Sequence, residues 1–317
     1  MSTPVALSIF VVGCDRSGTT LLRLMLTCHP DLAIPPESLF ARNLYPKWAS
    51  IRLTQAGQID ALCNDLYKDE KFSEWKLDRS LLQQTLREEL PLNYASFVAT
   101  VHRTYARQHQ PSASRWGDKN PAYVMHLGWL WHLFPDAQVV HIVRDGRAVF
   151  NSFRTSNLRA GYPIWPESAV KAARRWTSRL ASAKRYRANS SYMEVHYEKL
   201  VRSPETELRR LCSFLNLVYD PAMLDFARVN RQTELVPKHR LAWHDATLRT
   251  LQTARISAWQ QELDPADIAR FELMAGHNLL QYGYPLQVSK LGRFRLVNRV
   301  TVFWARLVNR TRRVINA

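Results

Sequence analysis

The segment that decides the fold is VVGCDRSGTTLLRLMLTCHPD, residues 11–31. An apolar run leads into a short polar turn, and the residues after the turn have the apolar spacing of an amphipathic helix. Two glycines of the turn, Gly13 and Gly18, have the G-x-x-x-x-G spacing of a loop that binds phosphate, although Thr19 stands where such a loop carries a lysine. The segment therefore predicts a strand, an anion-binding turn and a helix in succession.

The turn carries its positive charge before the second glycine. Arg16 lies inside the turn, and two hydroxyl side chains, Thr19 and Thr20, follow Gly18. The backbone N–H groups of such a turn and the N-terminus of the next helix attract an anion. This arrangement suits a 5′-phosphate that carries one further anionic group, without a long polyphosphate and without an obvious metal ion.

Strands alternate with helical segments along the rest of the chain. Alternation of this kind implies a parallel sheet with helices on both faces. We therefore predict an α/β fold, a P-loop-like three-layer sandwich, with a helical insertion at residues 42–110 and a helical C-terminal region. The elements expected are strands at 8–13, 138–143 and 191–200, an extended piece at 32–37, a strand end at 114–121, and helices at 18–28, 121–134, 166–188 and 204–215.

The charge of the chain narrows the class of its partners. Among its 317 residues are 44 Lys and Arg against 27 Asp and Glu, which gives a net charge of +17. Such an excess implies an anionic partner, whether a nucleotide, a nucleic acid, a sulfated or phosphorylated substrate, or a membrane surface. The length allows one large domain, which we place at residues 1–287, before a basic segment at 288–317.

The cysteines and the N-terminal residues help to predict the cellular compartment of the protein. The four cysteines have no paired spacing, so neither a zinc site nor a disulfide framework is expected. No basic residue precedes the first apolar run, which we interpret as a strand and not as a signal peptide. No apolar segment of the sequence reaches the ~18 residues that a membrane span requires. These features predict a cytoplasmic protein.

The phrase RSGTTLL after a strand resembles the 5′-phosphosulfate loop of sulfotransferases that use 3′-phosphoadenosine 5′-phosphosulfate (PAPS). That family has a second motif, a strand that ends in Arg with a Ser eight residues later on the next helix. Here VVHIVRDGRAVFNS supplies Arg144 at the strand end and Ser152 on the helix. Arginine forms a bidentate clamp on phosphate, and parallel strands present their ligands at their carboxyl ends. The alternative for Arg144 is a surface turn with a local ion pair.

The resemblance implies an enzyme that transfers a sulfuryl group from PAPS to an acceptor hydroxyl or amine and releases 3′-phosphoadenosine 5′-phosphate (PAP). It implies no metal, since sulfate esters carry less charge than phosphate monoesters. Arg144 and Ser152 would bind the 3′-phosphate. The ligands implied for the 5′ part of the donor are Arg16, Ser17, Gly18, Thr19 and Thr20.

Glu37 is the predicted general base. The sequence here is similar to that of tyrosylprotein sulfotransferases, with His-Pro-Asp at 29–31 and a glutamate 21 residues after the loop arginine, Arg16. In those enzymes this glutamate is the proposed base. Where they have an acidic residue just before it, this chain has Pro36, which argues against an acid-flanked tyrosine peptide as acceptor. The structural alternative for Glu37 is a charge at a helix N-terminus.

Four further residues are candidates by the same resemblance. Lys119, in GDKNP, would point at the transferred group, and an ordinary turn lysine is the alternative. Tyr197, at the end of a strand, would contact the nucleotide, and a core aromatic is the alternative. Arg249 and Arg255 lie in a segment that resembles the one closing over the nucleotide, where they would serve the 3′-phosphate or the sulfate; the alternative is solvated surface arginine.

Residues 288–317 contain basic side chains and no acidic one, with apolar residues at helical spacing. A basic amphipathic helix predicts contact with a membrane surface, which would make the protein peripheral. The alternative is a terminal helix whose apolar stripe docks on the body of the protein or on a second subunit, as in a homodimer.

Two other function classes compete with a sulfotransferase. A P-loop kinase is disfavoured because the loop lacks its lysine and no acidic strand end offers a magnesium site. A nucleic-acid-binding protein is disfavoured because no basic run is interleaved with aromatic residues and no reading helix is evident. The acceptor, a carbohydrate, a lipid, a peptide tyrosine or a small metabolite, stays open. We expect its specificity in the helical insertion.

Overall fold

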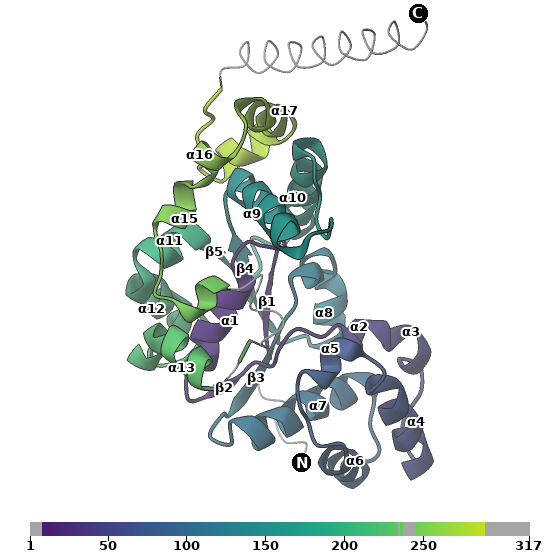
Figure 1. Cartoon of the computed structure of the whole chain (residues 1–317). Helices are drawn as coiled ribbons and strands as arrows, with labels where there is room; N and C mark the ends of the chain where they lie inside the picture. The colour runs from purple at the N-terminus through teal and green to yellow at the C-terminus, as the bar shows by residue number, and fades with distance from the viewer. Residues whose placement is uncertain (1–7, 234, 237–244, 289–317) are drawn as a thin grey trace, which may run out of the picture. The chain divides into compact units, whose positions relative to one another are not determined.

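The computed structural model describes residues 8–233, 235–236 and 245–288 (Figure 1). The predicted amphipathic helix at 288–317 therefore lies outside the described residues, apart from Val288. The chain groups into two compact units. The first comprises the described residues up to Val143 and Ser182–Leu251, and the second comprises Arg144–Ala181 and the described residues from Gln252 onward.

The first unit is built on a five-stranded sheet in the order β2-β3-β1-β4-β5. All four strand pairs are parallel, which confirms the predicted parallel sheet. β2 pairs with β3, so β3 lies between β2 and β1 in the sheet. The strands are β1 (Ile9–Gly13), β2 (Leu32–Ala33), β3 (Arg115–Lys119), β4 (Gln138–Val143) and β5 (Tyr192–His196).

Alternation along β1 explains how the sheet is covered. Successive side chains of a strand point to opposite faces, and Phe10 and Val12 join a core cluster with α7 (Tyr94–His109) and α8 (Leu127–Leu133). The alternate residues Ile9 and Val11 are also fully buried but lie outside that cluster. The helix after the glycine turn, α1 (Thr19–Thr27), packs against β1, β2 and β3 and contributes nothing to the cluster. Helices therefore cover both faces.

The segment between β2 and β3 is helical, as predicted. Its helices share the large aromatic and aliphatic core cluster of the first unit, in which Trp75 and Phe40 are fully buried. Besides α7 they are α2 (Phe40–Asn43), α3 (Tyr45–Trp48), α4 (Ala56–Leu66), α5 (Glu70–Ser73) and α6 (Arg79–Glu88).

The remaining elements of the first unit follow the later strands. The single helix expected at 121–134 is divided at His126 into a 3₁₀ turn and α8, and Tyr197 begins a helix directly after β5. The elements are η1 (Pro121–Met125), α11 (Tyr197–Arg202), α12 (Pro204–Leu215), η2 (Pro221–Asp225), α13 (Phe226–Thr233) and η4 (Asp245–Leu248).

The second unit is helical and packs around a close helix contact. A Cβ placed on Gly146 would lie 2.6 Å from Phe271 Cζ and 2.7 Å from Trp176 Cδ2, so glycine allows this approach. Its helices are α9 (Gly146–Ala160), α15 (Ala254–Ser257), α16 (Trp259–Glu262), α17 (Pro265–Gln281) and most of α10 (Ala169–Lys184). Over the residues described, no helix is long and apolar enough to cross a membrane.

Candidate active site

Two residues of the turn after β1, Arg16 and Gly18, have left-handed backbone conformations. Arg16 has φ 66°, in the left-handed region that residues other than glycine seldom adopt. Gly18 has φ 102°, and a Cβ there would lie 2.6 Å from Cδ2 of the Tyr197 ring. Glycine is therefore required twice over at this position, by conformation and by the close approach of Tyr197. The ring, predicted as a nucleotide contact, lies against the anion-binding turn.

The same turn holds a buried hydroxyl in need of a partner. Ser17 is 1% exposed, and among the described residues its Oγ has no hydrogen-bond partner. Its backbone N–H is used by the turn itself, since it donates to the Cys14 carbonyl at 3.1 Å. Buried polar atoms are nearly always satisfied in native proteins. An anion held at the N-terminus of α1 would supply an acceptor, so the residues present fit a phosphate or phosphosulfate group.

Glu37 lies four residues beyond the end of β2, after two prolines that keep the chain extended. Side chains hold the backbone on both sides of it: Trp75 Nε1 donates to the Pro36 carbonyl at 2.8 Å, and Asn120 Nδ2 donates to the Ser38 carbonyl at 2.8 Å. The backbone that carries this carboxylate is therefore fixed just beyond the carboxyl end of β2.

Two lysines hold the Glu37 carboxylate. Lys119 Nζ lies 2.8 Å from Oε2, and Lys71 Nζ lies 2.8 Å from Oε1. Lys119 ends β3 beside Val11 of β1, whereas Lys71 comes from α5 in the helical insertion. The three side chains differ in exposure, 22% for Glu37, 6% for Lys119 and 41% for Lys71. The predicted pair of Glu37 and Lys119 is thus brought together, with one ammonium buried and the other accessible to solvent.

Burial and the neighbouring lysines have opposite effects on the pKa of Glu37. Burial raises the pKa of Glu37, but the ammonium groups of Lys119 and Lys71 outweigh it and hold the pKa well below its ordinary value. Burial lowers the pKa of Lys119, although Glu37 opposes this shift. Glu37 is therefore ionised at neutral pH and can accept a proton, with its basicity set by how closely the lysines approach.

A buried polar layer lies behind Lys119. Asp118 is fully buried, and burial raises the pKa of its carboxyl to about 8, so this group holds a proton at neutral pH. Its Oδ1 accepts a 2.7 Å hydrogen bond from Asn120 Nδ2, and its Oδ2 lies 3.8 Å from His102 Nε2. Burial lowers the pKa of His102 to about 4, which keeps the imidazole neutral. The layer is therefore uncharged and fixes Asn120, which in turn holds the backbone beside Glu37.

In the second unit the two arginines of the sequence RDGR, residues 144–147, have different partners. The Asp145 carboxylate accepts a hydrogen bond from the backbone N–H of Arg147 at the start of α9. Its Oδ2 also forms an ion pair with Nη2 of the Arg147 side chain, at 2.7 Å. Arg147 is 1% exposed, so this local ion pair is buried and does not belong to the surface turn considered as the alternative. Arg144 Nη2 donates to the carbonyl of Arg255 at 3.1 Å, which joins two of the predicted cofactor residues. Ser152 lies on α9, half-buried.

Two further residues remain to be placed: Arg249, which the sequence predicted as a ligand, and Lys71, which it did not predict. Arg249 follows η4 in the first unit and is exposed. Lys71 was not predicted: it lies in the polar run KDEKFSEWK, 34 residues from Glu37. No local pattern marks one lysine of such a run, because its partner is fixed only when α5 packs against the segment after β2.

A parallel sheet whose first strand enters a glycine turn and a helix N-terminus is an architecture for binding and transferring anionic groups. The family model described as the sulfotransferase family matches residues 8–221, and the chain belongs to this family. It is therefore an enzyme of the class that transfers sulfate, as the RSGTTLL turn predicted.

Curated relatives agree with this assignment. The chain is 25% identical over 288 residues to protein-tyrosine sulfotransferase 1 of Danio rerio, covering 87% of this chain and 72% of the relative. It is 26% identical over 319 residues to the nodulation protein NoeE of Sinorhizobium fredii, covering 89% of this chain and 67% of the relative.

Solved structures share the fold. The sulfotransferase domain from the curacin biosynthetic pathway superposes with a TM-score of 0.60 at 20% identity, covering 88% of this chain and 98% of that domain. The sulfotransferase domain from the olefin synthase of Synechococcus PCC 7002 gives 0.57 at 24% identity, covering 88% and 95%. These similarities confirm the α/β fold.

Proposed function

We propose that this enzyme transfers the sulfuryl group of PAPS to an acceptor hydroxyl or amine by in-line displacement, with Glu37 as the general base. The observation that carries the proposal is the Glu37–Lys119 ion pair at the carboxyl end of the sheet that also presents the Gly13–Gly18 turn. A base, a cation and an anion-binding turn are the three groups that sulfuryl transfer needs.

The turn supplies the donor's 5′ end with its contacts. Ser17 Oγ and the backbone around Gly18 would bind the phosphosulfate, Arg16 would add charge, and Thr19 and Thr20 would add hydroxyl donors at the start of α1. Tyr197, packed on Gly18, would contact the nucleotide. Arg144, Ser152, Arg249 and Arg255 stay predicted ligands of the 3′-phosphate or the sulfate side.

The chemical step divides between two side chains. Glu37 takes the proton of the acceptor as its oxygen or nitrogen forms a bond to sulfur. The bond between sulfur and the bridging oxygen breaks at the same time, and that oxygen leaves with the electron pair as part of PAP. Lys119, released from Glu37 by this proton transfer, stabilises the charge on the sulfuryl and leaving oxygens.

Thermal stabilisation by PAP tests the proposal. We expect PAP to raise the Tm of the full chain clearly more than ATP with magnesium does, since the turn lacks the lysine of a triphosphate loop. Ser17→Ala removes only a hydroxyl that has no partner within the described structure, so we expect it to reduce the shift by PAP and to leave the ligand-free Tm nearly unchanged.

Ser50→Ala, at an exposed position in the helical insertion, is the matched control and should leave the shift intact. Equal stabilisation by both nucleotides, or none by PAP, would overturn the proposed donor.

A further inference from the structure

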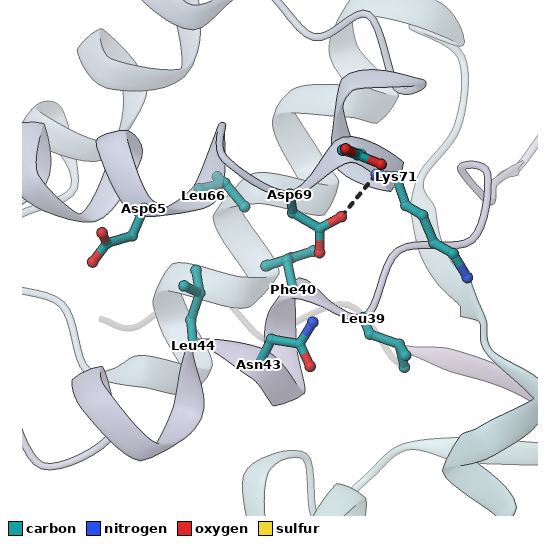
Figure 2. A pocket seen from close by; sticks show the side chains of 9 residues that line it. Leu39, Phe40, Asn43, Leu44, Asp65, Leu66, Asp69 and Lys71 are labelled. Atoms are coloured by element: carbon teal, nitrogen blue, oxygen red, sulfur yellow. Dashed lines mark hydrogen bonds between the residues drawn. The ribbon is translucent and has the colours of Figure 1, made fainter.

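A cavity of about 360 Å³ opens between α2, the end of α4 and α5 in the first unit. In Figure 2 the side chains of Leu66 and Asp69 face those of Asn43 and Leu44 across it. Its volume falls in the range of pockets that hold small organic ligands. It belongs to the helical insertion, the part of the chain in which acceptor specificity is expected.

Lys71 connects this cavity to the proposed base. The residue lines the cavity, and its Nζ lies 2.8 Å from Glu37 Oε1. The chain reaches the cavity again at Leu39 and Phe40, two and three residues after Glu37. Glu37 itself does not line the cavity, so Lys71 is the residue that contacts both the cavity and the carboxylate.

Most of the cavity wall is apolar. Leu39, Phe40, Leu44 and Leu66 contribute aliphatic and aromatic surface. Such a wall stabilises a hydrocarbon or aromatic body by burying it from water. A free sugar, with hydroxyls on every side, would leave those hydroxyls without partners against it.

Carboxylates set the charge of the cavity. Asp65, Asp69 and Glu70 line it together with one lysine, Lys71. Asp65 is already paired with Lys47 at 2.5 Å and with Lys68 at 3.1 Å, and Lys71 is paired with Glu37. Neither Asp69 nor Glu70 forms an ion pair with a basic residue of the described structure. Three carboxylates and one ammonium group therefore line the cavity, in a protein whose net charge is +17.

We propose that this cavity binds the body of the acceptor, and that the acceptor is an alcohol or phenol with an apolar body and an ammonium group. The inference rests on the proposed sulfuryl transfer. The ammonium pairs with Asp69 and Glu70, the body packs on Phe40 and its leucine neighbours, and the hydroxyl reaches toward Glu37 past Lys71. An acceptor that carries carboxylates is repelled by the same side chains.

Three phenols of matched size test the charge preference by isothermal titration of the full chain. Tyramine carries an ammonium, tyrosol is neutral, and 3-(4-hydroxyphenyl)propionate is an anion. We expect tyramine to bind up to about fivefold tighter than tyrosol, and the anion to bind weakest, since one partly exposed ion pair contributes up to about 1 kcal/mol.

Asp69→Asn with Glu70→Gln should abolish the preference. The asparagine side chain keeps the oxygen that caps α5 by accepting from the Lys71 and Phe72 N–H groups, so the helix start is preserved. Glu88→Gln, an exposed glutamate on α6, is the matched control and should retain the preference.

Equal affinity for the three phenols, no binding of any of them, or an unchanged preference in the double variant would overturn the inference. These outcomes are independent of the stabilisation by PAP. A PAP shift without a charge preference removes only the acceptor assignment, and a charge preference without a PAP shift removes only the proposed donor.

Discussion

For Glu37, the sequence predicts the residue itself but only part of its surroundings in the folded protein. Its place after His-Pro-Asp and two prolines was readable in the sequence, as was the lysine of GDKNP, Lys119. Its second partner, Lys71, was not, because the contact depends on the packing of α5 against the segment after β2. The identity of the proposed base could thus be predicted from the local sequence, whereas the pKa of Glu37 is set by tertiary contacts.

Replacement of Glu37 by Gln tests its role as the base. Gln keeps the size and one acceptor for the lysines but cannot take a proton, so we expect kcat to fall by about 100-fold or more. The measurement is sulfuryl transfer from PAPS to a phenolic acceptor, with the Tm shift by PAP as the control for folding and donor binding. Turnover close to that of the unmodified enzyme would exclude Glu37 as the base.

Lys71→Met tests the electrostatic role of the exposed lysine. Lys71 lowers the pKa of Glu37, so its removal should raise that pKa. Glu37 would then be protonated at higher pH, and the acidic limb of the kcat/KM profile should move to higher pH. Lys184→Met, at the exposed end of α10, serves as control. If both variants keep the original limb, Lys71 does not tune the base.

At the scale of elements, the sequence located strands better than it ordered them. β4 matches the predicted 138–143, and α12 matches 204–215, because a continuous apolar run and a Pro-initiated amphipathic pattern have clear ends. The expected strand at 191–200 ends early at His196, since Tyr197 already begins α11. The sequence gives no prediction of the strand order, in which β2 pairs with β3, because this order depends on contacts far apart in the sequence.

In the second unit, one arginine ties several elements together. Arg147 on α9 pairs with Asp145 and, at 2.6 Å, with Glu272 on α17, and it stacks on Trp259 of α16 with its Cζ 4.0 Å from the ring centre. Glu272 also accepts from the backbone N–H groups of Gln287 and Val288. The arginine thus neutralises two buried carboxylates and fixes the segment after α17.

Arg147→Met should destabilise this unit strongly. It would leave Asp145 and Glu272 buried without their cation, which typically costs about 3–5 kcal/mol. Urea unfolding measures the loss. Arg270→Met, which breaks a partly exposed pair with Asp267 on α17, is the control and should cost about 1 kcal/mol or less. Similar losses of unfolding free energy in the two variants would show that the buried network contributes no more to stability than an exposed ion pair does.

At the scale of the whole molecule, the composition predicts the sign of the charge on a binding partner, but it does not predict which residues bind it. The net charge of +17 predicts an anionic partner, yet the cavity that Lys71 lines has more carboxylates than lysines in its wall. A sum over the chain cannot reveal a local reversal of charge, because it depends on which side chains the fold brings together. The same holds for Asp118, whose buried state no charge count predicts.

Asp118 makes the stability of the fold depend on pH. Its pKa is raised from 3.8 to about 8 in the folded protein, so between these values the folded state keeps a proton that the unfolded state releases. The stabilisation by this group is fully present below about pH 4 and is lost as pH rises toward 8, at up to about 1.4 kcal/mol per pH unit. Asp118→Asn does not titrate, and its amide can hydrogen-bond to Asn120 as the protonated carboxyl does.

We therefore expect the free energy of unfolding of the unmodified protein to fall relative to that of Asp118→Asn as pH rises from about 5 to 8. Urea unfolding of both proteins across this range measures the difference, in which titrating groups that do not interact with Asp118 cancel. A difference that stays constant with pH would mean that Asp118 is already ionised in the folded state. The buried layer behind Lys119 would then be charged, and its link through Asn120 to the backbone beside Glu37 would need a different electrostatic account.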